Sequence, residues 1–466
     1  MNAVLNAERT TGTRRLVPWI IYLIFFAVLN ETVFNVSTPR IAEQFGLSPS
    51  GVSWMMTIFL VFFGIGSVIY GKLSDIFSLR SLIVIGIVIY NAGSAMGFLL
   101  QSSYPLVITA RAVQGMGASA IPALIFVVVA RYFSTSERGR IFGFITSTVS
   151  FAIGLGPVVG GFVSGSLNWS YLFLIPFLML VSIPFLTREL PREPRRQGTV
   201  DLVGAVLVAL TVGSLVVYLN FTGWYFAAGF VIFLAAFILR IRTTPDPFVQ
   251  PSLFRNARFR NGVIVGFCLF SIVIGILFLI PLMLHDIHGL GTTQIGLVLF
   301  PGAISSVIFG PIAGTLADRK GNSFVVAIGL ALLIASMIVM SFLLSGPALI
   351  IACALLLTYV GFSLFQTAMI NSVSQTLPAE ETGVGMGLFN LVSIISGAVG
   401  TAIVGKLLDG GRMQFRLLPT ISLARDSAYS NLMLVFSLVV VLGGVVYLRS
   451  YRRMPSIEQL GEDAPE

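Results

Sequence analysis

The chain has 466 residues, of which 56% are hydrophobic and only 10% are charged, and its mean hydropathy is +0.95. Because soluble globular proteins carry about 25% charged residues, this composition excludes an ordinary soluble enzyme and favours a protein embedded in a membrane. The formal net charge is +9, but the lysines and arginines are placed as membrane orientation requires, so no nucleic-acid partner is expected.

Apolar runs of about 20 residues, the length that crosses the hydrocarbon core of a bilayer, follow one another along the chain. We find fourteen, which start near Leu16, Ser53, Leu82, Tyr104, Ile141, Trp169, Leu202, Gly223, Phe259, Ile295, Phe324, Pro347, Gly383 and Ser430. The pattern predicts an all-α polytopic membrane protein with fourteen transmembrane helices. An even number of spans places both termini on the same side of the membrane.

The basic residues indicate which side that is. Alternate loops, counted from the N-terminus, hold most of the 28 lysines and arginines. The opposite loops hold Arg40, Lys406, Arg412, Arg416 and Arg425. Since basic residues are enriched in cytoplasmic loops, we expect both termini to be cytoplasmic. The polar first residues and the long first apolar run do not fit a removable signal peptide.

Two short sequences occur twice at nearly the same spacing. GKLSDIFSLR (71–80) is similar to GTLADRKGN (314–322), and SERGRIFGF (136–144) is similar to AEETGVGMGLF (379–389). Two matches at one offset predict two homologous six-helix bundles, an arrangement typical of alternating-access transporters. The predicted units are an N-terminal bundle (1–198), two extra linker helices (199–257) and a C-terminal bundle (258–466).

An acid, Glu31, lies inside the first apolar run. Glu31, Asn35 and Thr38 share one helix face, and Asn30 borders that face. Intramembrane acids face the bundle interior and usually have a partner or a function. Because burial favours the protonated form of a carboxyl group, Glu31 is a candidate for binding and releasing protons. A static ion pair or a protonated filler is the structural alternative.

Arg111 is the expected partner of Glu31. The two residues lie at similar depths, roughly 8–10 Å from the same end of their helices at 1.5 Å per residue. Arginine does not release its own proton, so it would hold Glu31 ionised until a cationic substrate or a second proton competes. Gln114 lies three residues further and shares the face of Arg111. A purely structural pair is again the alternative.

Further motifs connect these features to a known family. They are LNETVFNVSTP (29–39), RAVQGMG (111–117) and GLGPVVGG (154–161). With the two loops above, they resemble the signatures of the major facilitator superfamily, in its fourteen-helix drug–proton antiporter branch. The resemblance implies a major facilitator fold with 6 + 2 + 6 helices. It implies gating roles for Gly71, Asp75, Arg80, Gly154, Gly156, Pro157, Gly160, Gly161, Gly314, Asp318 and Arg319.

The shifted acid Glu31, with WSYLFLIPF (169–177), DPFV (246–249) and YSNL (429–432), resembles the Gram-positive tetracycline-efflux proteins of class K and class L. This implies a bacterial plasma-membrane transporter, not an enzyme, that acts as a monomer. It would export a tetracycline–divalent metal complex, the metal being Mg²⁺ or another divalent cation, in exchange for protons. Glu31, Arg111 and Asp75 would couple transport to protons, without a cofactor.

The helix predicted from Pro347 carries polar residues at roughly helical spacing, Tyr359, Ser363, Gln366, Asn371 and Ser374. In the fold that the resemblance implies, this helix lines the central cavity. Drug pockets are mostly apolar with a few placed polar groups. The candidate substrate-binding residues are Asn30, Asn35, Gln114, Tyr359, Gln366 and Asn371. His285, Asp286 and His288 have a spacing that could bind a metal, but a solvated loop is favoured, so no metal site is predicted.

One departure keeps the substrate open. The class K and L pumps carry an acid on helix 13, where this chain has Gly397. Two alternatives therefore stand beside tetracycline export. The first is export of several drugs or of another amphiphile, and the second is exchange of a monovalent cation, Na⁺ or K⁺, for protons.

Overall fold

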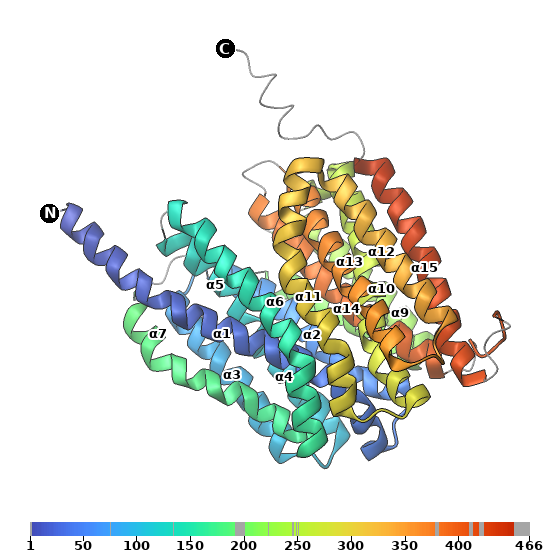
Figure 1. Cartoon of the computed structure of the whole chain (residues 1–466). Helices are drawn as coiled ribbons and strands as arrows, with labels where there is room; N and C mark the ends of the chain where they lie inside the picture. Colours follow the sequence, from blue (N-terminus) through green and yellow to red (C-terminus); the bar gives the residue numbers. More distant parts are fainter. Residues whose placement is uncertain are drawn as a thin grey trace.

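The computed structural model is helical almost throughout the residues that it describes (Figure 1). Those residues are 2–74, 76–133, 135–191, 201–221, 223–244, 247, 249, 251–377, 382–409, 413–418 and 424–451. Helices are expected from such a sequence, because apolar runs in a membrane must satisfy their backbone hydrogen bonds within the segment.

The helices form two halves, and a hairpin follows the first half and precedes the second in the chain. The N-terminal half contains α1 (Asn2–Phe45), α2 (Pro49–Leu73), α3 (Leu79–Leu99), α4 (Tyr104–Ala118), α5 (Ala120–Tyr132), α6 (Thr135–Ser166), the 3₁₀ helix η1 (Trp169–Ser182) and α7 (Ile183–Glu189). The hairpin is α8 (Leu202–Phe221) and α9 (Trp224–Thr243). The C-terminal half contains η2 (Pro251–Arg255), α10 (Ala257–His288), α11 (Thr292–Lys320), α12 (Asn322–Phe342), α13 (Ala348–Ser374), α14 (Thr382–Asp409) and α15 (Ala424–Tyr451).

Twelve helical segments in the described residues are long and apolar enough to cross a membrane. The apolar parts of α6 and α8 are shorter, at Phe151–Ser166 and Val203–Leu219. The chain is therefore a multi-pass membrane protein, as its composition predicts. The number fourteen stays a prediction.

The helix predicted from Tyr104 is broken in two. It ends at Ala118 and resumes as α5 after Ser119, so that Pro122 lies in the first turn of the new helix. Proline has no N–H to donate to the carbonyl of Ala118 four residues earlier, which explains why the continuous hydrogen-bond ladder fails here. Pro301, in contrast, lies inside the continuous helix α11.

The two halves meet along two seams, α6 with α11 and α2 with α14. In the α2–α14 seam, the hydroxyls of Thr57 and Thr401 lie 2.8 Å apart and form a hydrogen bond. In the α6–α11 seam, Thr293 donates to the carbonyl oxygen of Gly161 at 3.0 Å. These contacts lie toward the end of the bundle where α1 ends and α2 begins, which we call the closed end. Helix α1 begins and helix α15 ends at the opposite end, which we call the terminal end (Figure 1).

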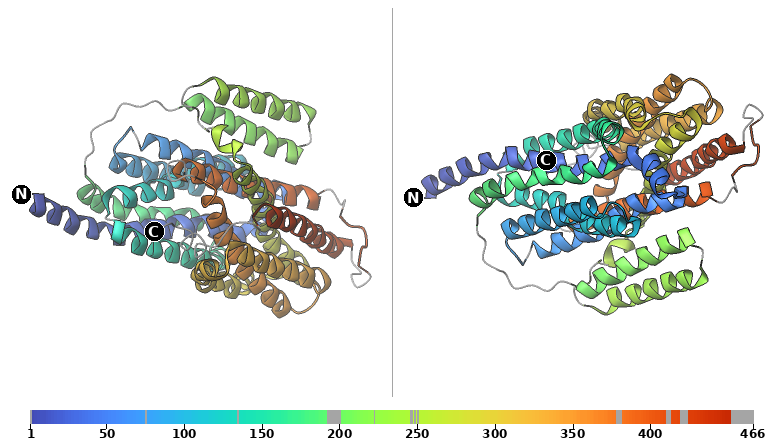
Figure 2. Two further views of the ribbon diagram at one scale, coloured as in Figure 1. Left: turned by 90° about the horizontal axis from the view of Figure 1, so that it is seen from above. Right: turned by 90° about the horizontal axis from the view of Figure 1, so that it is seen from below.

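The α8–α9 hairpin lies on the outside of the two halves (Figure 2). Helix α8 packs against both α2 and α14, so it covers one of the two seams. Asp201, just before α8, joins the two helices of the hairpin, because its Oδ1 accepts a hydrogen bond from Arg240 Nε at 3.0 Å. The same carboxylate accepts the N–H of Gly204 at 3.0 Å and so caps the start of α8.

Candidate functional site

Glu31 lies on α1 and is half-buried. In the described part of the chain, its carboxylate makes no hydrogen bond and no ion pair. Asn35, one turn further along α1, is also half-buried and its side-chain amide likewise has no partner among these residues. The predicted polar face of α1 therefore presents an acid and an amide that are free to bind a proton, a cation or a substrate.

Arg111, on α4, is fully buried. Its Nε donates to the carbonyl oxygen of Met55 on α2 at 3.1 Å, and its Nη1 donates to Oε1 of Gln114 at 3.0 Å. The guanidinium carbon lies 4.4 Å from the ring centre of Phe34 and 4.1 Å from that of Phe59. Two aromatic faces thus stabilise the cation electrostatically where water is excluded.

The expected ion pair between Glu31 and Arg111 is not formed, although both residues belong to the described part of the chain. The remaining nitrogen of Arg111, Nη2, is buried without a hydrogen-bond partner. A buried charge without a direct ion pair is costly, and here the carbonyl, the amide and the two rings surround and stabilise the guanidinium. An unfilled donor at this position is available to an anion or an oxygen atom.

A chain of hydrogen bonds continues from Gln114 through the N-terminal half. Nε2 of Gln114 donates to the Ser94 hydroxyl at 2.8 Å, and Ser94 donates to the Tyr90 carbonyl at 2.9 Å. The Tyr90 hydroxyl donates to Oδ1 of Asn30 at 2.8 Å. The Asn30 amide then donates to the carbonyl of Leu172 at 3.0 Å. This network fixes α1, α3, α4 and η1 relative to one another around Arg111.

The sequence pattern did not select Tyr90 or Ser94. A signal was present, since Tyr90, Asn91 and Ser94 place polar groups within one turn of an apolar helix. The oxygen and the nitrogen of the Asn30 side-chain amide both form hydrogen bonds in this network, so Asn30 links α1 to α3 and η1. Its proposed contact with substrate stays a prediction, as do the substrate contacts of Asn35 and Gln114.

The candidate residues of the C-terminal half are spread along α13. Tyr359 is buried and packs against Gly302 of α11, where an added Cβ would come within 2.6 Å of the ring. Gln366 is exposed. Asn371 donates to Oδ1 of Asn322 at 2.9 Å, which places it at the start of α12. The structure therefore does not bring these three side chains together at one point.

The glycine-rich stretch of α6 packs closely on two neighbours. Gly156 and Gly160 face α1, where a Cβ on Gly160 would clash with the carbonyl oxygen of Val33. Gly154 and Gly161 face α11, and a Cβ on Gly161 would come within 2.6 Å of the carbonyl oxygen of Thr292. Pro157 is buried between them. Glycine is required here because the helix backbones touch.

The other residues with predicted gating roles lie at the end of the bundle opposite the closed end. Gly71 and Arg80 flank the turn between α2 and α3, and Gly314 and Arg319 lie near the end of α11. Gly71 and Gly314 have open space where a side chain would be. Asp75 lies outside the described residues, and the side chain of Asp318 lies outside them too.

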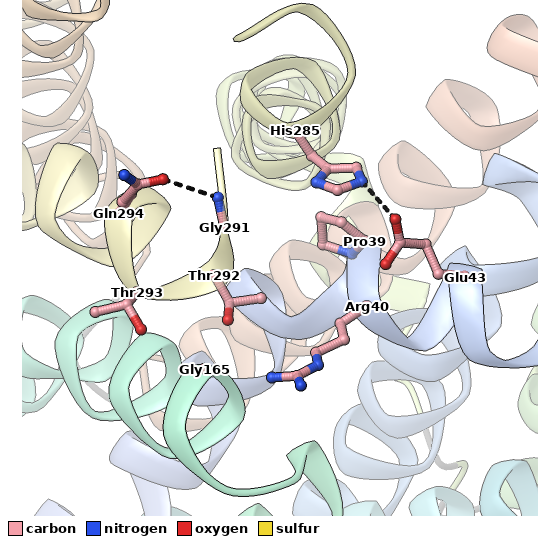
Figure 3. A pocket seen from close by; sticks show the side chains of 9 residues that line it. All are labelled: Pro39, Arg40, Glu43, Gly165, His285, Gly291, Thr292, Thr293 and Gln294. Atoms are coloured by element: carbon pink, nitrogen blue, oxygen red, sulfur yellow. Dashed lines mark hydrogen bonds and ion pairs between the residues drawn. The ribbon is translucent and has the colours of Figure 1, made fainter. Parts of the chain in front are cut away.

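A charged cleft of about 330 Å³ lies at the closed end, between α1, α6, α10 and α11 (Figure 3). His285 of α10 and Glu43 of α1 face each other across it, with 2.9 Å between Nε2 and Oε1. The solvated loop expected at His285, Asp286 and His288 is instead the last turn of α10, which ends at a left-handed Gly289. Asp286 accepts the hydroxyl of Tyr429 at 2.6 Å. Among the described residues, no group of potential ligands could hold a metal.

Sequence comparison finds relatives that include a named transporter and a drug-resistance protein. The chain is 25% identical over 400 residues to the riboflavin transporter RibZ of Clostridioides difficile (strain 630), covering 82% of this chain and 87% of the relative. It is 26% identical over 432 residues to the lincomycin resistance protein LmrB of Listeria monocytogenes serovar 1/2a (strain ATCC BAA-679 / EGD-e), covering 88% and 90%.

Comparison with solved structures finds transporters that share this fold. A bacterial homologue of the human lysosomal transporter Spinster, solved in an inward-facing and unoccupied conformation, superposes with a TM-score of 0.68 at 14% identity, covering 95% of this chain and 97% of that one. At this identity the likeness concerns the fold alone. The model of the Major Facilitator Superfamily matches residues 20–401, most of the chain. The chain therefore belongs to the Major Facilitator Superfamily of membrane transporters.

Proposed function

We propose that this protein is a proton-coupled efflux antiporter of a bacterial plasma membrane, with both termini cytoplasmic. The observation that carries the proposal is the pair of unfilled charged groups in the N-terminal half, the Glu31 carboxylate and Nη2 of Arg111. An intramembrane acid that has no fixed partner can exchange its proton as its surroundings change. A resistance protein among the relatives supports a drug as the exported compound.

In the proposed cycle, Glu31 takes up a proton while the protein faces outward and releases it while the protein faces inward. Proton entry is favourable by about 2.3 kcal/mol per 100 mV of membrane potential, to which the pH gradient adds. Arg111 does not release a proton, and the network through Gln114 and Ser94 holds it in place. Its fixed positive charge would favour proton release from Glu31 when the two side chains approach.

The first candidate substrate is a tetracycline–divalent metal complex, which the motifs around Glu31 support. A second candidate is a different amphiphilic drug, and one observation favours it. Gly397, at the position of the acid expected on helix 13, is packed by Ile274 and Leu60, whose carbons would lie within 3.4 Å of an added Cβ. The packing leaves no room for an acidic side chain without rearrangement. Exchange of Na⁺ or K⁺ for protons is the remaining alternative.

Inverted membrane vesicles with an imposed proton gradient test these candidates. Tetracycline with Mg²⁺, lincomycin, ethidium, Na⁺ and K⁺ are added separately, and collapse of the gradient identifies the exchanged substrate. Collapse by either ion alone would favour the cation exchanger over drug efflux. If no compound changes the gradient relative to vesicles that lack the protein, proton-coupled export is wrong.

The variant Glu31→Gln tests the coupling residue in the same vesicles. It should reduce collapse to the level of vesicles without the protein, while the amount of folded protein stays unchanged. Glu189→Gln, which removes a carboxylate at the end of α7, is the matched control and should transport normally. Full collapse in Glu31→Gln would remove this residue from the mechanism.

A further inference from the structure

The charged cleft at the closed end has a second set of groups that the proposed transport site does not use. Helix α11 begins here with Thr292, and the first N–H groups of a helix have no carbonyl partner within it. These groups carry a partial positive charge that attracts anions. Gly291, the residue before the helix, has no side chain to cap them, and its own N–H donates to Gln294 Oε1 at 3.0 Å.

Thr292 supplies an independent observation that points to a ligand. Its relative exposure is 7%, yet its hydroxyl forms no hydrogen bond among the residues that the structure describes. The residue lines the cleft, and Figure 3 shows its hydroxyl directed into the space between α1 and α6. Because this hydroxyl opens into the cleft without a protein partner among the described residues, a ligand bound there could accept its hydrogen bond.

Arg40 brings a full positive charge to the same space. Its guanidinium extends from α1 toward α6 and the start of α11 (Figure 3). It makes no hydrogen bond or ion pair within the described parts of the chain. Gly165 of α6 also lines the cleft, and an added Cβ there would lie 3.3 Å from Thr292 Oγ1. Glycine at this position lets α6 approach the start of α11, because an added Cβ would also clash with the hydroxyl of Thr293.

Among the described residues, Glu43 is the one acid that lines this cleft, and its carboxylate points away from Arg40. Its carboxylate is directed toward His285, at 2.9 Å, and away from the guanidinium of Arg40 (Figure 3). The cleft is therefore divided into a Glu43–His285 side and a positively charged side. Only the positively charged side combines a guanidinium, a free hydroxyl and the start of a helix.

We propose that the positively charged side of this cleft binds a phosphate group. Arg40 offers two parallel N–H donors, which suit a phosphate oxygen pair, and Thr292 and the first N–H groups of α11 supply further donors. Arg40 belongs to the N-terminal half and Thr292 to the C-terminal half, so the site is complete only when the closed end is assembled. A bound phosphate group therefore stabilises the closed end, because it binds that conformation preferentially.

The test uses the purified full-length protein in detergent. Thermal unfolding is followed as inorganic phosphate is added, with sodium chloride at matched ionic strength as the reference. The unfolding midpoint should rise in the wild type and in Arg416→Gln, which removes an exposed arginine from the loop after α14. Arg40→Gln and Thr292→Val should each weaken the phosphate effect, Arg40→Gln by about tenfold or more in the concentration required.

The same proteins distinguish the source of the phosphate group. A short-chain phosphatidic acid is titrated in place of inorganic phosphate, and a response at lower concentration than that for phosphate indicates a lipid headgroup. The thermal unfolding midpoint measured without ligand shows whether each variant is folded. If Arg40→Gln does not fold, Thr292→Val still tests the site. Absence of any shift in the wild type with either ligand overturns the proposal. Equal shifts in all four proteins also overturn it, because they indicate an adventitious ion only.

Discussion

Asp409, the last residue of α14, accepts a hydrogen bond from the backbone N–H of Ser50 in the first turn of α2, with 3.0 Å between Oδ1 and N. The hydroxyls of Ser48 and Ser50 donate to its other oxygen. The carboxylate of one half thus lies on the N-terminus of a helix of the other half. Because a helix N-terminus carries a partial positive charge, this contact stabilises the closed end.

Replacing Asp409 with Asn should therefore loosen the closed end. The loss of a charge-assisted hydrogen bond at a helix N-terminus is worth about 1–2 kcal/mol, and 1.4 kcal/mol is about tenfold in the ratio of closed to open molecules. Nitroxide labels at Leu100→Cys and Leu349→Cys, with Cys268→Ser and Cys353→Ser, report the distance across this end by pulsed electron resonance. The distances should become longer. An unchanged distribution would show that the contact does not hold the halves together.

The substitution Arg111→Lys should distinguish the contribution of the positive charge from that of the planar guanidinium group. Arg111→Lys keeps the charge but loses the bond from Nε to Met55 and the flat contact with Phe34 and Phe59. We expect thermal stability to fall by about 2–4 kcal/mol and transport to fall with it. Arg188→Lys, at the end of α7, is the control and should change neither. Wild-type stability in Arg111→Lys would contradict the importance of the planar group.

Gly160 should not tolerate even a methyl group. An alanine Cβ there would meet the carbonyl oxygen of Val33, so α6 and α1 would have to separate, at a cost of about 1–3 kcal/mol. Gly213 of α8 has open space, and alanine there should be neutral or stabilising by up to about 1 kcal/mol. Thermal unfolding of the two variants measures the difference. Equal midpoints would mean that the seam adapts without strain.

Asp201→Ala should loosen the hairpin without affecting the two halves. It removes the cap on Gly204 and the ion pair with Arg240, in which the Asp201 side chain is 1% exposed. Loss of a helix N-cap costs about 0.5–2 kcal/mol. Hydrogen exchange should become faster in α8 and α9 and stay unchanged in α12 and α13. Faster exchange throughout would instead show that the hairpin stabilises the whole protein.

Much of the architecture could be predicted because the relevant signals are local. Hydropathy and length marked the membrane segments, and the glycines of GLGPVVGG marked a helix that contacts its neighbours closely. The boundaries were less predictable where local chemistry competes with hydropathy. The break at Ser119 depends on Pro122, which has no N–H for the carbonyl of Ala118. The last turn of α10 reaches His288 because Gly289 ends it in a left-handed conformation.

The candidate site was only partly predictable. Glu31, Arg111 and Gln114 stand out because polar side chains are costly in apolar helices, and the hydrogen bond between Arg111 and Gln114 follows from their spacing on α4. The partner of Arg111 was not predictable, since equal depth in the membrane does not specify which side chains meet. In the structure its hydrogen bonds go to Gln114 and to Met55 of α2.

By itself, the sequence determined that the chain is a membrane protein built from apolar helices, with an acid and an arginine in the first half. It could do so because hydrophobicity and helical periodicity are properties of neighbouring residues. Only the tertiary structure decided that Asp409 caps α2, that Tyr90 binds Asn30, and that Arg40 and Thr292 share a cleft. These contacts join residues far apart in the chain, and they depend on how whole helices pack, which no local pattern specifies.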